Sequence, residues 1–196
     1  MGGRYHITQL RLMQEQAEEI LASYRDQFGH PITVPVQPEV IARALFGLRI
    51  ETSNLSRFGQ RVCGTLSVDE KTIYVDTHCT WRQRSFAVAH ELGHWILHED
   101  HQASQLDVGE SQAISLSQIL LSRRARTKKE QARLREIEAN RFAAALLVPY
   151  TVLMEQVSKF AIIDAQVVGN LARKFNVSTQ TMRYRIMDLF NHQLWT

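Results

Sequence analysis

The 196-residue sequence has only two cysteines and four prolines, and no apolar run approaches the roughly 18 residues of a membrane-spanning helix. Its first residues, Met1 to His6, lack the apolar segment of a secretory signal peptide. Cys63 and Cys79 do not form a CxxC pair. We therefore expect two free thiols in the reducing cytoplasm and no membrane partner.

The charge is close to balanced, with a formal net charge of +3. A surplus this small argues neither for nor against nucleic-acid binding. Apolar residues make up 44% of the chain and charged residues 22%, which is typical of a globular protein. We find no internal repeat. The length suits one domain with a small appendage, so we divide the chain into a main domain, 1–150, and a helical segment, 151–196, packed on it.

The chain contains a His-Glu-x-x-His motif at residues 90–94. On a helix, His90 and His94 lie one turn apart and share a face, from which both imidazoles can reach one Zn²⁺. Glu91 lies about 100° around the helix, close enough to contact a water on the metal without binding the ion. The opposite face is apolar and buries the helix; it carries Phe86, Val88, Ala89, Leu92 and Ile96.

A second helix, predicted over residues 131–148, supplies a candidate third ligand. Glu136 shares a face with small side chains that allow another helix to approach. A His₂Glu set leaves a fourth position for water, as in catalytic zinc sites. Glu138 points about 160° away from Glu136, so only one of them can be the ligand. We prefer Glu136 because Glu138 lies on the side of two arginines, Arg135 and Arg141.

The remaining pattern predicts an α+β fold, in which a small antiparallel sheet packs on the motif helix and on the second ligand-bearing helix. Apolar spacing predicts helices over 7–28 and 39–46, each followed by a glycine. Strands are expected at three places, with the last two joined as a hairpin: 48–50, 61–68 and 72–75. Thr80 suits the N-cap of the motif helix. An edge strand beside a metal site can pair with an extended peptide; the alternative is that the sheet only covers the core.

The C-terminal segment shows a helix-turn-helix pattern, with helices predicted over 165–175 and 178–190. The exposed face of the second helix would carry Thr179, Gln180, Arg183 and Tyr184. Residues 151–196 hold five Lys/Arg and three Asp/Glu, a surplus of two. Because DNA affinity needs many phosphate contacts, we favour a structural or docking role over DNA binding. We interpret the basic run 123–129 as a solvated loop rather than a grip for acid or nucleic acid.

Several stretches, taken in order, resemble the ImmA/IrrE family of metallo-endopeptidases. They are Pro38-Glu39-x-Ile41-Ala42, the strand with Gly64, the His-Glu-Leu-Gly-His motif followed by Leu97-His98, residues 136–143 and residues 146–149. The resemblance implies a fold similar to small thermolysin-like domains. It also implies metal binding by His90, His94 and Glu136 and catalysis by Glu91. Several family members cut a partner transcriptional repressor and so release genes of mobile elements or of a stress response.

We therefore predict an intracellular zinc endopeptidase that makes a limited cut in a partner protein, a helix-turn-helix repressor. Glu91 would take a proton from the attacking water and pass it to the leaving nitrogen. Mn²⁺ or Fe²⁺ can replace Zn²⁺ on the same nitrogen and oxygen ligands. Candidate donors to the oxyanion are Tyr74, His98 and His101, and Asn140 is placed to orient a metal ligand. The alternative is a regulator that binds DNA or a repressor without proteolysis and holds a structural metal.

Overall fold

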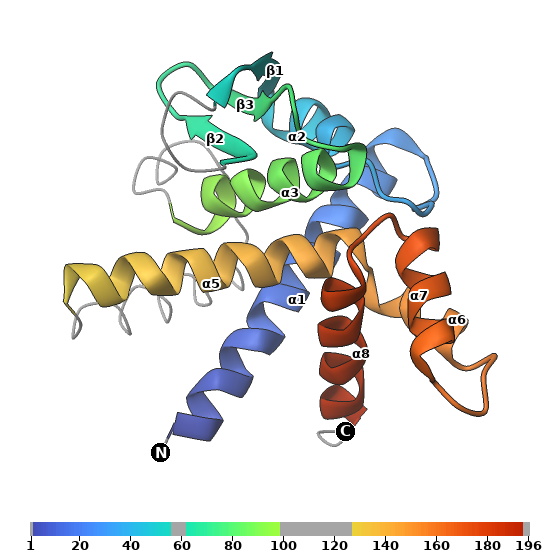
Figure 1. The fold of residues 1–196 in the computed structure, drawn as a ribbon. Coiled ribbons are helices and arrows are strands. Elements are labelled where there is room, and N and C mark those ends of the chain that lie inside the picture. The colour runs from blue at the N-terminus through green and yellow to red at the C-terminus, as the bar shows by residue number, and fades with distance from the viewer. Residues whose placement is uncertain (1, 56–61, 99–126, 194–196) are drawn as a thin grey trace.

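The structure is a computed structural model that describes residues 2–55, 62–98 and 127–193. Two helices form its centre, α3 (Trp81–Leu97) and α5 (Lys128–Leu147). A three-stranded sheet covers one side of α3, and α5 packs against the other side (Figure 1). The predicted α+β fold class is confirmed.

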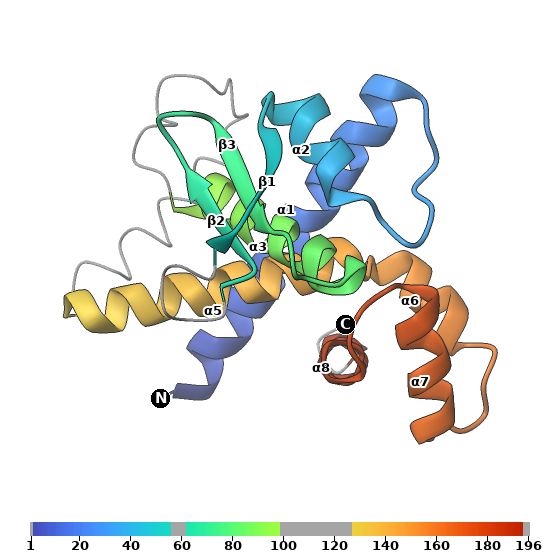
Figure 2. The same cartoon turned by 45° about the horizontal axis from the view of Figure 1, so that its top comes forward.

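The sheet consists of β1 (Arg49–Ser53), β2 (Gly64–Ser67) and β3 (Thr72–Asp76) in the order β1-β3-β2 (Figure 2). β2 and β3 form the predicted antiparallel hairpin. β1 pairs with β3 in the parallel direction, so the sheet is mixed rather than antiparallel throughout. Residue patterns indicate a strand but not its partner, and here β3, the last of the three strands in the chain, lies between β1 and β2. β2 is consequently an edge strand of this sheet.

Local capping signals determine where several helices begin and end. α2 (Pro38–Phe46) starts at a proline and ends at Gly47, whose φ of +62° suits glycine. At the start of α3, Thr80 Oγ1 accepts a hydrogen bond from the Gln83 N–H, and Gln83 Oε1 accepts one from the Thr80 N–H, which confirms the predicted N-cap. Thr127 and Glu130 form the same capping box at the start of α5.

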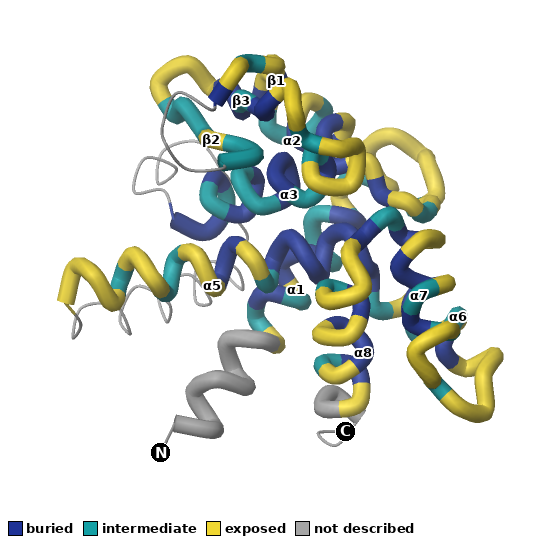
Figure 3. The backbone as a smooth tube through the Cα atoms, in the orientation of Figure 1, coloured by how far each residue is buried: buried dark blue, intermediate teal, exposed yellow. Residues whose placement is uncertain are grey.

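α3 and α5 approach each other closely at a glycine inside the motif. A Cβ atom on Gly93 would lie 3.2 Å from the Ala139 Cα atom and 3.1 Å from a ring carbon of Phe142, so a larger residue would push the helices apart. α1 (Gly2–Phe28) packs across α5 and buries Met13 and Leu21. The first half of α5 is largely exposed, whereas its second half is mostly buried (Figure 3).

The C-terminal segment contains α6 (Tyr150–Val157), α7 (Ala165–Lys174) and α8 (Thr179–Gln193). Seven apolar side chains form the expected buried core of this helix pair, namely Leu171, Ala172, Phe175, Val177, Met182, Ile186 and Leu189. The buried Arg185 guanidinium donates to the Val148 carbonyl at 2.9 Å and 3.2 Å, which ties α8 to the end of α5. The four predicted recognition-face residues, Thr179, Gln180, Arg183 and Tyr184, are exposed.

Two cysteines behave differently from the prediction. Cys63 and Cys79 form a disulfide rather than two free thiols. Cys63 precedes β2 and its carbonyl accepts a hydrogen bond from the Asp76 N–H, while the Cys79 N–H donates to the Asp76 carbonyl. This turn brings two residues 16 positions apart to a Cα–Cα distance of 6.0 Å. The cysteine content therefore no longer supports a cytoplasmic location, which stays a prediction.

Two further expectations from the sequence concern membrane-spanning helices and the basic run 123–129. Within the part of the chain that the structure describes, no helix has the length and apolar character needed to span a membrane. Of the basic run 123–129, residues 123–126 lie outside the described residues. Lys128 and Lys129 are exposed, as predicted, but they belong to the first turn of α5 rather than to a loop.

Candidate metal centre

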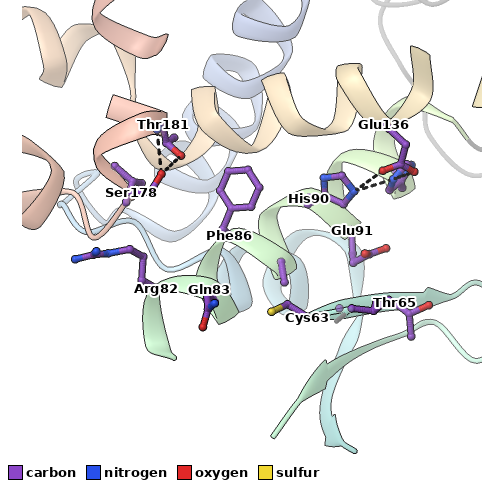
Figure 4. Close-up of a pocket in the computed structure, with 15 residues that line it drawn as sticks. Cys63, Thr65, Arg82, Gln83, Phe86, His90, Glu91, Glu136, Ser178 and Thr181 are labelled. Carbon is purple, nitrogen blue, oxygen red and sulfur yellow. Dashed lines mark hydrogen bonds and ion pairs between the residues drawn. The ribbon is translucent and has the colours of Figure 1, made fainter. Parts of the chain in front are cut away.

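Three side chains from two helices converge at the junction of α3 and α5. His90 Nε2 lies 3.4 Å from Glu136 Oε2, His94 Nε2 lies 3.3 Å from Glu136 Oε1, and the two Nε2 atoms are 3.0 Å apart. His90 and Glu136 point toward one another across the gap between the helices (Figure 4). In a tetrahedral zinc site with bonds of about 2.0–2.1 Å, neighbouring ligand atoms are separated by roughly 3.3 Å. The three side chains therefore fit the donor set and the spacing of a zinc site.

Hydrogen bonding and burial prepare both imidazoles to bind a cation. The Asn140 side-chain oxygen lies 3.1 Å from His90 Nδ1 and accepts a hydrogen bond from the Nδ1–H group, which leaves the Nε2 lone pair directed at the site. Burial lowers the pKa of His90 below 6.5 against the opposing charge of Glu136. Burial and the neighbouring His90 lower the pKa of His94 as well. Both rings are therefore neutral at pH 7, as metal ligands must be.

The carboxyl group of Glu91 lies in the same cleft and faces β2. Burial raises the pKa of Glu91 to about 7, the charge of Glu136 adds to this effect, and a hydrogen bond from the Leu66 backbone N–H opposes it. A Cβ atom on Gly64 would lie 3.0 Å from the Ala87 Cβ atom and 3.4 Å from Glu91 Cγ. Glycine thus allows the edge strand to approach α3. A carboxyl group with a pKa near 7 can both accept and return a proton at neutral pH.

These residues lie in a cleft of about 750 Å³ that extends beyond the three candidate ligands. Its walls include β2 and the first half of α3, where Arg82 and Phe86 lie. Val177, Ser178 and Thr181, from the turn before α8 and its first residues, close the far end (Figure 4). Sequence reasoning missed this last wall because it depends on how α7 and α8 pack against the rest of the chain. Gly64 in β2 was the one local signal in the sequence that the strand backbone approaches α3 closely.

The other predicted site residues lie elsewhere. The Glu138 carboxylate is buried against His98, 3.7 Å from its Nδ1 atom, so Glu136 and not Glu138 faces the two motif histidines. Tyr74 donates a hydrogen bond to Glu70 at 2.8 Å on the sheet. Neither Tyr74 nor His98 lines the cleft, and His101 lies outside the described residues. No predicted oxyanion donor therefore reaches the site within the described part of the chain.

Comparisons with known proteins agree with this architecture. A Mycobacterium tuberculosis transcriptional regulator has a similar fold, with a TM-score of 0.57 and 18% sequence identity over 91% of this chain. The present chain spans 50% of that regulator, and identity this low shows only a shared fold. Comparison with curated protein sequences gave no match. The sequence profile of the IrrE N-terminal-like domain, Peptidase_M78, matches residues 45–187, which include the motif and Glu136. The chain therefore belongs to the Peptidase_M78 family of IrrE N-terminal-like domains.

Proposed function

We propose that this protein is a zinc-dependent endopeptidase that makes a limited cut in a partner protein. The observation that carries the proposal is the convergence of His90, His94 and Glu136 beside the protonatable carboxyl group of Glu91. The family assignment supports the same class of activity. Nitrogen and carboxylate ligands also accept Mn²⁺ or Fe²⁺, so the donor set alone does not select the metal.

In the proposed reaction the two imidazoles and Glu136 hold the ion. The bound metal would polarise the scissile carbonyl and lower the pKa of a water molecule. Glu91 takes the proton from the attacking water and then gives it to the leaving nitrogen. The Leu66 N–H holds the Glu91 carboxyl group in place during both transfers. Asn140 keeps the His90 ring in the tautomer that presents Nε2.

The edge strand offers a way to align an extended substrate. The Asp76 N–H donates to the Cys63 carbonyl, and residues alternate in direction along an antiparallel pair. Gly64 and Leu66 therefore direct their backbone groups away from β3. The Leu66 N–H is used by Glu91, so the Gly64 N–H and carbonyl and the Leu66 carbonyl are the groups that a substrate backbone would bond. Such pairing requires an extended peptide, which favours cleavage in a linker over cleavage in a helix or a core strand.

We propose a DNA-binding repressor as the substrate. The family resemblance supports this choice, and the solved structure with a similar fold is itself a transcriptional regulator. A linker in such a repressor would supply the extended peptide that the edge strand can pair with. A cytoplasmic location follows from such a substrate.

The test first searches the neighbouring genes for a helix-turn-helix repressor and then co-incubates that repressor with the zinc-loaded protein. Wild-type protein should release two defined fragments, and Glu91→Gln should bind zinc but produce none. Glu51→Gln, the same chemical change on an exposed strand residue, should cut like the wild type. A Glu91→Gln protein that cuts at the wild-type rate would refute the assigned base.

A second candidate function is regulation without proteolysis, with the metal in a structural role. It is favoured by the helix-turn-helix arrangement of α7 and α8, whose predicted recognition face is exposed. Arg183→Ala, on that face, should then weaken DNA binding and relief of repression. Under the peptidase proposal the same variant leaves cleavage unchanged, and a chelator abolishes all function.

A further inference from the structure

We propose that His98 and Glu138 form a buried clamp between α3 and α5 that positions Glu136 as a metal ligand. This inference rests on the proposed metal site but not on proteolysis. His98 and Glu138 do not line the cleft, so they act through Glu136 as positioning residues.

The need for a clamp follows from where the ligands lie. His90 and His94 belong to one helix, so their spacing is determined by that helix alone. Glu136 comes from the largely exposed first half of α5, and its own side chain is 60% exposed. Its position depends on how α5 crosses α3, and one close approach of the two helices is at Gly93 and Ala139.

α3 and α5 pack along much of their length, but Glu136 lies in the exposed half of α5, where a small change in the crossing angle of the helices would move it. Glu136 lies three residues from Ala139, about 4.5 Å along the helix axis. A rotation of ~10° about the contact at Ala139 would move Glu136 by about 0.8 Å, given this distance. Metal–ligand distances in a well-formed site agree to within about 0.2 Å, so a second contact beside Glu136 itself would hold the carboxylate more accurately.

His98 provides this second contact. Its Nε2 atom lies 2.9 Å from the Arg135 carbonyl, and because a carbonyl can only accept, Nε2–H donates. Arg135 immediately precedes Glu136. On the other side of Glu136, the Glu138 carboxylate lies 3.7 Å from His98 Nδ1. The imidazole thus contacts the chain both before and after the third ligand.

The same imidazole is connected to the motif helix. The His98 N–H donates to the His94 carbonyl at 3.1 Å, and the two rings lie 5.1 Å apart. His98 therefore links the turn of α3 that carries His94 to the turn of α5 that carries Glu136. The His98 and Glu138 side chains are only 4% and 3% exposed. Apolar residues of similar size often stabilise a core equally well, which favours a geometric role for this polar pair.

The experiment measures metal binding rather than cleavage. Zn²⁺ affinity is determined by competition with a chromophoric chelator, and the absorption of the Co²⁺-loaded protein reports ligand geometry. His98→Leu removes the donor at similar volume and should weaken Zn²⁺ binding about 10- to 100-fold, with an altered Co²⁺ spectrum. His98→Gln keeps an N–H near the Nε2 position and should restore most of the affinity. Leu97→Ala, a buried neighbour, should lower stability but leave Zn²⁺ affinity and the spectrum unchanged.

Glu138→Gln, which keeps the shape, covers the case in which His98→Leu does not fold, and should weaken Zn²⁺ binding several-fold. Folded His98→Leu or Glu138→Gln protein with wild-type affinity and spectrum would overturn the clamp. An affinity loss in Leu97→Ala equal to that in His98→Leu would also overturn it, because general destabilisation would then explain the result. A wild-type protein that binds zinc and shows these differences, yet cuts no partner, would refute the peptidase proposal alone.

Discussion

Replacing Glu91 by glutamine should stabilise the metal-free protein at high pH. The Glu91 carboxyl group is buried beside Glu136, and burial raises its pKa from 4.5 to about 7. Folding therefore disfavours the ionised form. Glutamine has nearly the same shape, is never charged, and can still accept the Leu66 N–H. The variant thus removes an unfavourable charge without removing the hydrogen bond.

The size of the effect follows from the two pKa values. A change from 4.5 to about 7 corresponds to about 3 kcal/mol of unfolding free energy, at about 1.4 kcal/mol per pH unit. A raised carboxyl pKa gives stability that is present at low pH and is lost as pH rises from 4.5 through 7. The unfolding free energy of Glu91→Gln should therefore exceed that of the wild type by about 3 kcal/mol at pH 8 and by only about 1 kcal/mol at pH 5. The two motif histidines titrate in both proteins, so their contributions largely cancel in the difference.

Urea unfolding of both proteins in chelator, at pH 5 and pH 8, measures this difference. Glu51→Gln is the matched control, because its exposed carboxylate should change stability by less than about 0.5 kcal/mol at either pH. Saturating Zn²⁺ should reduce the advantage of Glu91→Gln, since a nearby cation favours the carboxylate. Equal stability of variant and wild type at pH 8, or a gain that does not depend on pH, would refute the argument from burial.

Three other substitutions test separate parts of the site. Asn140→Ala removes the acceptor for His90 and should weaken Zn²⁺ binding about 10-fold in a chelator competition, whereas Asn140→Asp should not. Gly64→Ala adds a Cβ atom 3.0 Å from that of Ala87, so it should displace β2 and lower kcat for partner cleavage while Zn²⁺ affinity stays the same. Thr80→Ala removes the cap of α3 and should lower the unfolding free energy by about 1 kcal/mol in urea, again without affecting Zn²⁺ affinity.

The parts of the fold that could be predicted from sequence depend on neighbouring residues. Thr80 caps α3, Gly47 ends α2 and Asp164 caps α7, because each signal acts within one turn of helix. The hairpin of β2 and β3 is local in the same sense. Two predictions were wrong. β1 was expected in an antiparallel sheet but pairs with β3 in the parallel direction, and Cys63 and Cys79 were expected as free thiols but form a disulfide. Both depend on which distant segments meet, and residue patterns carry no such information.

The candidate site divides in the same way. His90 and His94 share a face because they lie on one helix, and the period of α5 separates Glu136 from Glu138. The Leu66 N–H that contacts Glu91 is a backbone group, so residue identity gives no sign of it. His98 was one candidate donor to the oxyanion, with a satisfied histidine at the helix end as the favoured alternative, and in the structure it faces Glu138 in the core. Whether the His98 side chain, one turn beyond the motif, faces the cleft or the protein interior depends on how α3 and α5 cross, which the sequence pattern does not show.

The position of α8 bears on whether the helix-turn-helix pattern serves DNA binding. In such motifs the first residues of the recognition helix contact the bases. Here Ser178 and Thr181, at the start of α8, line the cleft that leads to the candidate metal centre. A peptide that fills the cleft and a duplex that docks on the start of α8 would therefore compete for the same surface. Because the surrounding segment has a surplus of only two positive charges, the peptide of the proposed function is the better match, and the start of α8 then acts as a wall of the cleft.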